Sequence, residues 1–133
     1  TTEIYTLSLH DALPILDNLS IQGQLYASVS QLTPFTLRLK QARKAAGISQ
    51  TELGLRIGFE AGSASSRMNH YEKGRHLPEL ETMKRMAKEL SVPLSYFFCE
   101  TDAEAELVML FSKLTDEQKI KFLAGLKEKA STK

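Results

Sequence analysis

The chain has 133 residues, of which 42% are hydrophobic and 25% are charged, and its formal net charge is +1. This composition is ordinary for one globular domain with a small appendage, and no run approaches the ~20 apolar residues that a membrane-spanning helix needs. The single cysteine, Cys99, cannot form an internal disulfide, so we interpret it as a small buried residue of a cytoplasmic protein.

The first residues of the chain do not read as part of the fold. Residues 1–16 contain no Lys or Arg and include Pro14, so they lack the pattern of a secretory signal. Back-translation of residues 1–15 gives, without a mismatch, a string similar to a common short-read sequencing adapter. We therefore interpret residues 1–16 as adapter-derived. No methionine precedes Met68, and residues 17–33 are a leader that is partly untranslated if Val29 is the initiator.

Five helices are expected between residues 34 and 98. Thr33-Pro34 is a favourable helix start, the Ser49–Glu52 stretch has the pattern of a capping box, and glycines at 47, 58 and 74 are stop signals. The apolar spacing then places the helices at residues 34–46, 50–57, 63–73, 78–90 and 94–98. Because no period-2 alternation of any length occurs, the predicted fold class is all-α.

The charge of this segment differs from that of the rest of the chain. Residues 34–98 hold eleven Lys/Arg and six Asp/Glu, whereas residues 99–133 hold six and seven. An excess of five positive charges indicates an anionic partner for the first segment only.

Several stretches of residues 34–98 resemble one family. LRLKQARKAAGISQTELGLRIG, RMNHYEKGRHLP, LETMKRMAKEL and SVPLSYFF are similar to the Cro and phage-repressor type of helix-turn-helix domain, the XRE family. The resemblance implies a five-helix, lambda-repressor-like DNA-binding domain over residues 34–98. It also implies that the second helix crosses the DNA backbone while the third enters the major groove.

The resemblance assigns roles to two sets of residues. The candidates for base contacts lie in the third helix, where Arg67 can fork onto guanine and Asn69 can pair with adenine; they are Ser65, Ser66, Arg67, Asn69 and His70. The candidates for phosphate contacts are Gln50, Lys73, Arg75, His76, Lys40 and Arg38. The stretch from Gly58 to Met68 is four residues longer than in most relatives, so the third helix could begin earlier and bring Ser63 to the groove.

Three further residues of this segment are expected to be structural. Arg43 and Glu72 match a pair that forms a partly buried ion pair in many relatives, joining the first helix to the end of the third. Gly54 stands where alanine is usual, and it allows the second helix to approach the third closely. Glycine costs about 1 kcal/mol of helix propensity relative to alanine.

The remaining residues, 99–133, are expected to form a C-terminal helical hairpin. Capping boxes begin at Thr101 and Thr115, and each is followed by an apolar stripe. Two interpretations stay open, because this apolar area must cover either the DNA-binding domain as a lid or a second copy in a dimer.

These features favour a sequence-specific DNA-binding transcriptional regulator, a dimeric repressor whose partners are double-stranded DNA and a second copy of the chain. The alternative is an antitoxin that regulates its own operon and binds a partner toxin through the C-terminal helices. An enzyme is not expected, since no catalytic motif, cofactor-binding loop or metal-ligand cluster occurs, and we expect no cofactor and no membrane partner.

Overall fold

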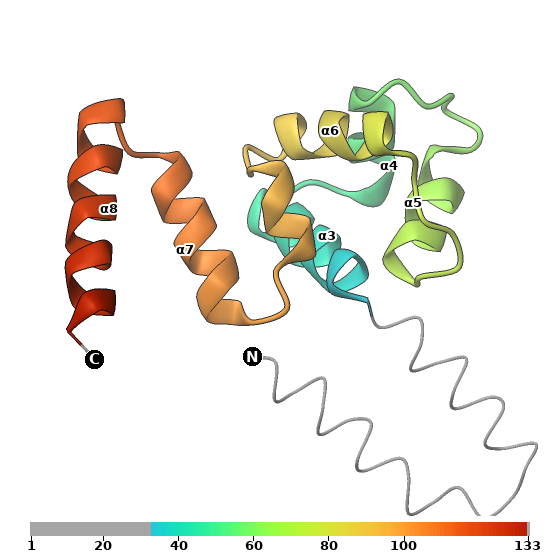
Figure 1. Ribbon diagram of the computed structural model, residues 1–133. Coiled ribbons are helices and arrows are strands. Elements are labelled where there is room, and N and C mark those ends of the chain that lie inside the picture. The colour runs from blue at the N-terminus through green and yellow to red at the C-terminus, as the bar shows by residue number, and fades with distance from the viewer. Residues whose placement is uncertain (1–32, 133) are drawn as a thin grey trace, which may run out of the picture.

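The described part of the chain consists of six α-helices and one 3-10 helix (Figure 1). The computed structural model describes residues 33–132, and no strand occurs within them. The elements are α3 (Pro34–Ala45), α4 (Gln50–Arg56), α5 (Ala64–Glu72), α6 (Leu80–Glu89), η2 (Leu94–Phe98), α7 (Asp102–Ser112) and α8 (Asp116–Ser131). The all-α prediction is confirmed. The interpretations of residues 1–16 and of the leader up to residue 32 lie outside the described residues.

Side-chain caps set the start of four helices. The hydroxyls of Thr33, Ser49, Thr101 and Thr115 each accept a hydrogen bond from the backbone N–H three residues later. At Thr115 the box is reciprocal, because the Gln118 side chain accepts from the Thr115 N–H at 2.9 Å. At Ser49 the Glu52 carboxylate instead pairs with Arg56, one helical turn further on. Each cap satisfies a backbone donor that the helix itself leaves unpaired.

The same C-terminal motif ends four helices. After α3, α4 and α5 the chain turns through Gly47, Gly58 and Gly74, whose φ angles are +70°, +97° and +73°. In each turn the N–H after the glycine bonds a carbonyl five residues back, as from Phe59 to Gly54 at 2.9 Å. This is the Schellman motif, in which the left-handed position favours glycine. After α6 the position is held by Ser91, at φ +54°.

The core lies where α3, α4, α5, α6 and η2 meet. Its most deeply buried large apolar side chains are Phe35, Leu39, Leu53, Met68, Met86 and Phe97. The rings of Phe35 and Phe97 meet edge to face with centroids 5.2 Å apart, so η2 closes the core against α3. Burial of side chains of this size contributes about 1.5–3 kcal/mol each, and it fixes which faces of α4 and α5 remain outside.

The start of α6 differs from the sequence prediction. The helix begins at Leu80 and not at Pro78, because Glu79 is extended at φ −64° and ψ 157° and acts as the N-cap. Pro78 is buried in the connection instead of opening the helix.

The C-terminal helices form a hairpin at the edge of the molecule. In Figure 1, α7 lies between α8 and the helices that form the core. α7 packs on η2 and buries Ala105, whereas α8 has no buried residue. The hairpin therefore joins the domain mainly through α7, and α8, which buries no residue, does not cover the core in the manner of a lid.

Candidate nucleic-acid interface

Helices α4 and α5 are in very close contact at one glycine. A Cβ placed on Gly54 would lie 2.8 Å from the Cβ of Ala64 and 3.0 Å from the carbonyl oxygen of Ala64. Neither distance leaves room for a methyl group. The absence of a side chain at Gly54 thus sets the spacing of the two helices.

The first turn of α5 is the most exposed part of the helix. Ser65, Ser66 and Arg67 are exposed, whereas Asn69 and His70 are half-buried. Ala64 and Met68 are fully buried and anchor the opposite face. α5 therefore carries all five residues predicted to contact bases, and three of them are presented to solvent.

The longer connection before α5 does not extend the helix. α5 begins at Ala64, and Ser63 is its N-cap without a side-chain capping bond. The Ser63 hydroxyl lies 3.4 Å from the Glu60 carbonyl oxygen, inside the turn. The residues after Gly58 are taken up by this turn, so the earlier helix start that the sequence left open does not occur.

Side chains around α5 contact one another across elements. The Arg67 guanidinium carbon lies 3.8 Å from the centroid of the Phe59 ring. The Gln50 Nε2 amide is 3.5 Å from Asn69 Oδ1, at the limit of a hydrogen bond, so the start of α4 faces the middle of α5. The rings of His70 and His76 are 5.4 Å apart and, with Arg67 and Tyr71, line a hollow of about 80 Å³.

Most of the predicted phosphate-contact residues are accessible. Lys73, Arg75 and His76 are exposed in the loop that follows α5, and Lys40 is exposed on α3. The Arg75 N–H bonds the His70 carbonyl at 2.9 Å, which ties this loop to the end of α5. Gln50 is half-buried at the first position of α4. The structure thus places a positively charged loop directly beside the exposed helix.

Arg38 is the exception, and its prediction as a phosphate contact is corrected. The residue is 2% exposed. Its Nε donates to the Cys99 carbonyl at 2.9 Å, and its Nη1 donates to Asp102 Oδ1 at 2.7 Å. Arg38 therefore holds α3 against the start of α7, and its guanidinium is unavailable to a phosphate. Its position between Phe35 and Leu39, on the buried stripe of α3, was the sequence signal for this role.

Arg43 and Glu72 connect α3 to the end of α5. Arg43 Nε and Nη2 donate to the two Glu72 carboxylate oxygens at 2.6 and 2.9 Å, and Arg43 Nη1 donates to the Ile48 carbonyl at 2.9 Å. This bidentate hydrogen bonding to Glu72 raises the pKa of Arg43 against the opposing effect of burial. Because Glu72 is buried, the pair fixes the C-terminal end of α5 relative to the domain.

Phe59 was not among the residues singled out from the sequence. It is half-buried directly after the Gly58 turn, and its ring contacts both Arg67 and Tyr71. An apolar residue directly after a helix-ending glycine commonly packs back on the helix, and that pattern was the available signal.

Two further findings concern metal sites and membrane spans in the described residues. Between residues 33 and 132, no group of three His, Cys, Asp or Glu side chains is arranged to hold a metal ion. In the same range, no helix has the length and hydropathy to cross a bilayer.

Comparisons with known proteins agree on one family. Residues 39–97 match a family described as helix-turn-helix. Three chains of solved structures match, and one is the crystal structure of the transcriptional regulator BswR. It is 42% identical, with a TM-score of 0.66, over 70% of this chain and 92% of that one. The search of curated proteins gave no match.

Proposed function

Because this chain belongs to the XRE-type helix-turn-helix family of DNA-binding transcriptional regulators, we propose that it represses transcription by occupying a specific operator as a homodimer. It is not an enzyme. Repression of this kind needs only occupancy of the DNA, and it takes place in the cytoplasm of the cell.

The observation that carries the proposal is the exposed first turn of α5. Arg67 can donate two hydrogen bonds to a guanine, and Ser65 and Ser66 can donate to or accept from base edges. Asn69 and His70 lie further along the helix, where Asn69 can bond an adenine. With α5 in the major groove, each good bidentate contact discriminates between bases by about 1–3 kcal/mol.

The loop after α5 supplies affinity without sequence information. Lys73, Arg75 and His76 are exposed there, beside a helix that enters the groove, where they meet the sugar–phosphate backbone. Lys40 on α3 and Gln50 on α4 complete this set. Each phosphate that a cation neutralises releases counterions, so binding weakens as salt rises.

Salt dependence tests this assignment. The full chain is used to select its operator from random duplexes, and the affinity is then measured by fluorescence anisotropy across salt concentrations. Lys73→Ala and Arg75→Ala should each reduce the slope of log K against log salt by about 0.9 and leave the preferred sequence unchanged. Lys127→Ala, on α8, removes the same charge far from α5 and should leave the slope unchanged. Operator binding that is insensitive to salt would contradict the proposal.

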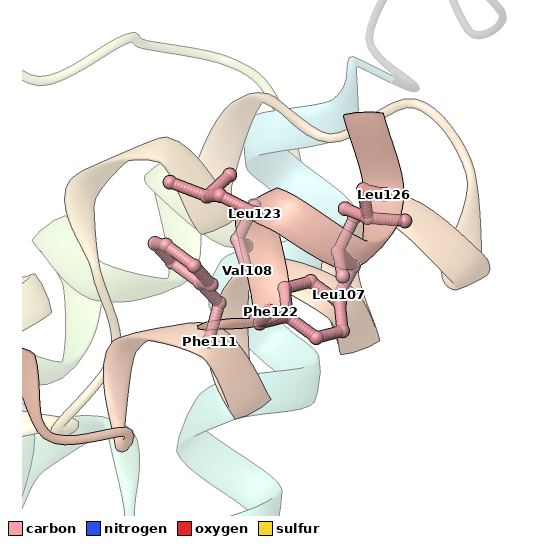
Figure 2. A pocket seen from close by; sticks show the side chains of 6 residues that line it. All are labelled: Leu107, Val108, Phe111, Phe122, Leu123 and Leu126. Carbon is pink, nitrogen blue, oxygen red and sulfur yellow. The ribbon is translucent and has the colours of Figure 1, made fainter. Parts of the chain in front are cut away.

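The C-terminal hairpin carries the apolar surface that supports a homodimer. Of the ten large hydrophobic residues exposed between residues 33 and 132, six lie in this hairpin, namely Leu107, Leu110, Ile120, Phe122, Leu123 and Leu126. A hollow of about 170 Å³ runs between the two helices, and Figure 2 shows side chains from both helices lining it. Exposed apolar patches often mark sites of protein–protein contact, and a second copy covers this one in the proposed dimer. Two copies then read two half-sites about one helical turn of DNA apart.

The dimer is tested by placing a charge in the hollow. Leu126→Glu should shift the full chain to a monomer in analytical ultracentrifugation and weaken operator binding, without changing the preferred half-site. Lys127→Glu is the matched control, because it introduces the same carboxylate beside the hollow residue, outside the lining. If Leu126→Glu remains dimeric, the hairpin is not the interface. If the unmodified chain is itself monomeric and co-purifies with a small toxin, the antitoxin alternative replaces the homodimer.

A further inference from the structure

The turn between α4 and α5 places an aromatic ring beside a residue that is proposed to read DNA. Gly58 takes up the left-handed position after α4, and the N–H groups of Gly58 and Phe59 bond the carbonyls of Leu55 and Gly54 at 3.0 and 2.9 Å. These two bonds fix the backbone of Phe59. The end of α4 therefore sets the position of the Phe59 side chain.

The Phe59 ring lies between the core and the Arg67 side chain. It packs against the core cluster, and its centroid is 6.2 Å from that of Tyr71. The Arg67 guanidinium carbon lies 3.8 Å from the ring centroid, within the range of a cation–π contact. Among residues 33–132, Arg67 forms no ion pair, so no carboxylate competes for its donors.

Stacking of this kind suits the recognition of guanine. A guanidinium stacked on a ring keeps its in-plane N–H groups free, and bidentate bonding to guanine O6 and N7 uses two of those donors. An exposed Arg side chain otherwise samples many rotamers, and ordering it on binding lowers the affinity. The ring reduces this loss, because Arg67 is already held before the DNA arrives.

We propose that Phe59 is a specificity-determining residue, which positions Arg67 to read one guanine in each half-site. This inference rests on the proposed function, in which α5 enters the major groove. Phe59 itself touches no DNA in this arrangement. It acts through Arg67, and its contribution is confined to the base that Arg67 reads.

The test compares base preference with total affinity in the full chain. Operator selection identifies the base position at which Arg67→Lys loses its guanine preference, since Lys cannot reproduce the planar fork. Phe59→Leu keeps an apolar side chain and removes the aromatic face, and it should lower the guanine preference at that same position by about 2- to 5-fold. Its affinity for non-specific DNA should not change. Phe59→Tyr retains the ring and should keep the guanine preference of the unmodified chain. The double variant with Phe59→Leu and Arg67→Lys should lose no more guanine preference than Arg67→Lys alone.

Three outcomes overturn the inference. Phe59→Leu could keep the full guanine preference, it could weaken binding to all sequences equally, or Arg67→Lys could leave every position unchanged. If Phe59→Leu loses helicity by circular dichroism, the same comparison is made with Phe59→Met. If the unmodified chain selects no sequence, the proposed function itself fails. If it selects an operator and Phe59→Leu selects the same operator with the same guanine preference, only the inference about Phe59 fails.

Discussion

Gly54→Ala tests the close contact that positions α5. The new methyl group would lie 2.8 Å from the Ala64 Cβ, and 3.0 and 3.1 Å from the Ala64 carbonyl oxygen and Cα. Two of these three atoms belong to the backbone, so the clash cannot be relieved by rotation of a side chain. α5 must move away from α4, or the chain must accept the strain.

Two opposing effects set the magnitude. Alanine is favoured over glycine inside a helix by about 1 kcal/mol, and overpacking a well-filled site costs about 1–3 kcal/mol. Because the contact is with backbone atoms, we expect the upper part of that range and a net loss of about 1–2 kcal/mol. For a domain of this size the loss corresponds to a fall in Tm of roughly 5–15 °C.

Thermal unfolding followed by circular dichroism measures the effect. Gly125→Ala is the matched control, because it makes the same change inside α8 with nothing within 4 Å of the added group beyond its chain neighbours and the backbone of its own helix, and it should not lower Tm. Combining Gly54→Ala with Ala64→Gly removes the shortest contact, so the double variant should be more stable than the sum of the single losses predicts. A Tm for Gly54→Ala equal to or above that of the unmodified chain would refute the reasoning, since helix propensity would then outweigh the contact.

Three other residues give independent predictions. Arg43→Ala leaves the Glu72 carboxylate buried without its cation and should lower the free energy of unfolding in urea by about 3 kcal/mol, whereas Lys84→Ala, from an exposed pair, should change it little. Equal effects of the two variants would contradict a structural role for the buried pair. Ser91→Gly removes the Cβ that strains the left-handed backbone at this position, and it should raise the free energy of unfolding by about 1 kcal/mol. Ser91→Ala retains a Cβ and should give no gain. Burial raises the pKa of the Cys99 thiol, an effect that Arg38 opposes and Glu104 supports. Alkylation of Cys99 by iodoacetamide at neutral pH should therefore be slower in the native chain than in urea, and equal rates would show that the thiol is accessible.

Caps and stops were predictable from the sequence because they depend on neighbouring residues. The hydroxyl of Thr33 or Thr115 bonds an N–H three residues away, and the Gly47, Gly58 and Gly74 turns close within six residues. Such bonds depend mainly on neighbouring residues, so the number and order of the helices followed from local chemistry. The family resemblance also rested on these short patterns and on the apolar spacing between them.

Other features depend on residues that are distant in the chain. The position of Arg38 on the apolar stripe of α3 was a signal of burial, but its partner Asp102 is 64 positions away, so only the packing of α7 on η2 shows which group it bonds. The same holds for Phe59, whose ring reaches Arg67 because α4 and α5 meet at Gly54.

The sequence by itself determined the helices, the family and the helix ends other than the start of α6, because these follow from hydrogen bonds and apolar spacing within a few residues. Only the tertiary structure decided which charged groups remain free to meet DNA and which apolar face stays uncovered. Arg38 is held by hydrogen bonds to Cys99 and Asp102, Arg67 lies over the Phe59 ring, and α8 buries none of its side chains. Each outcome depends on how helices pack against one another, and packing brings together residues that no local pattern connects.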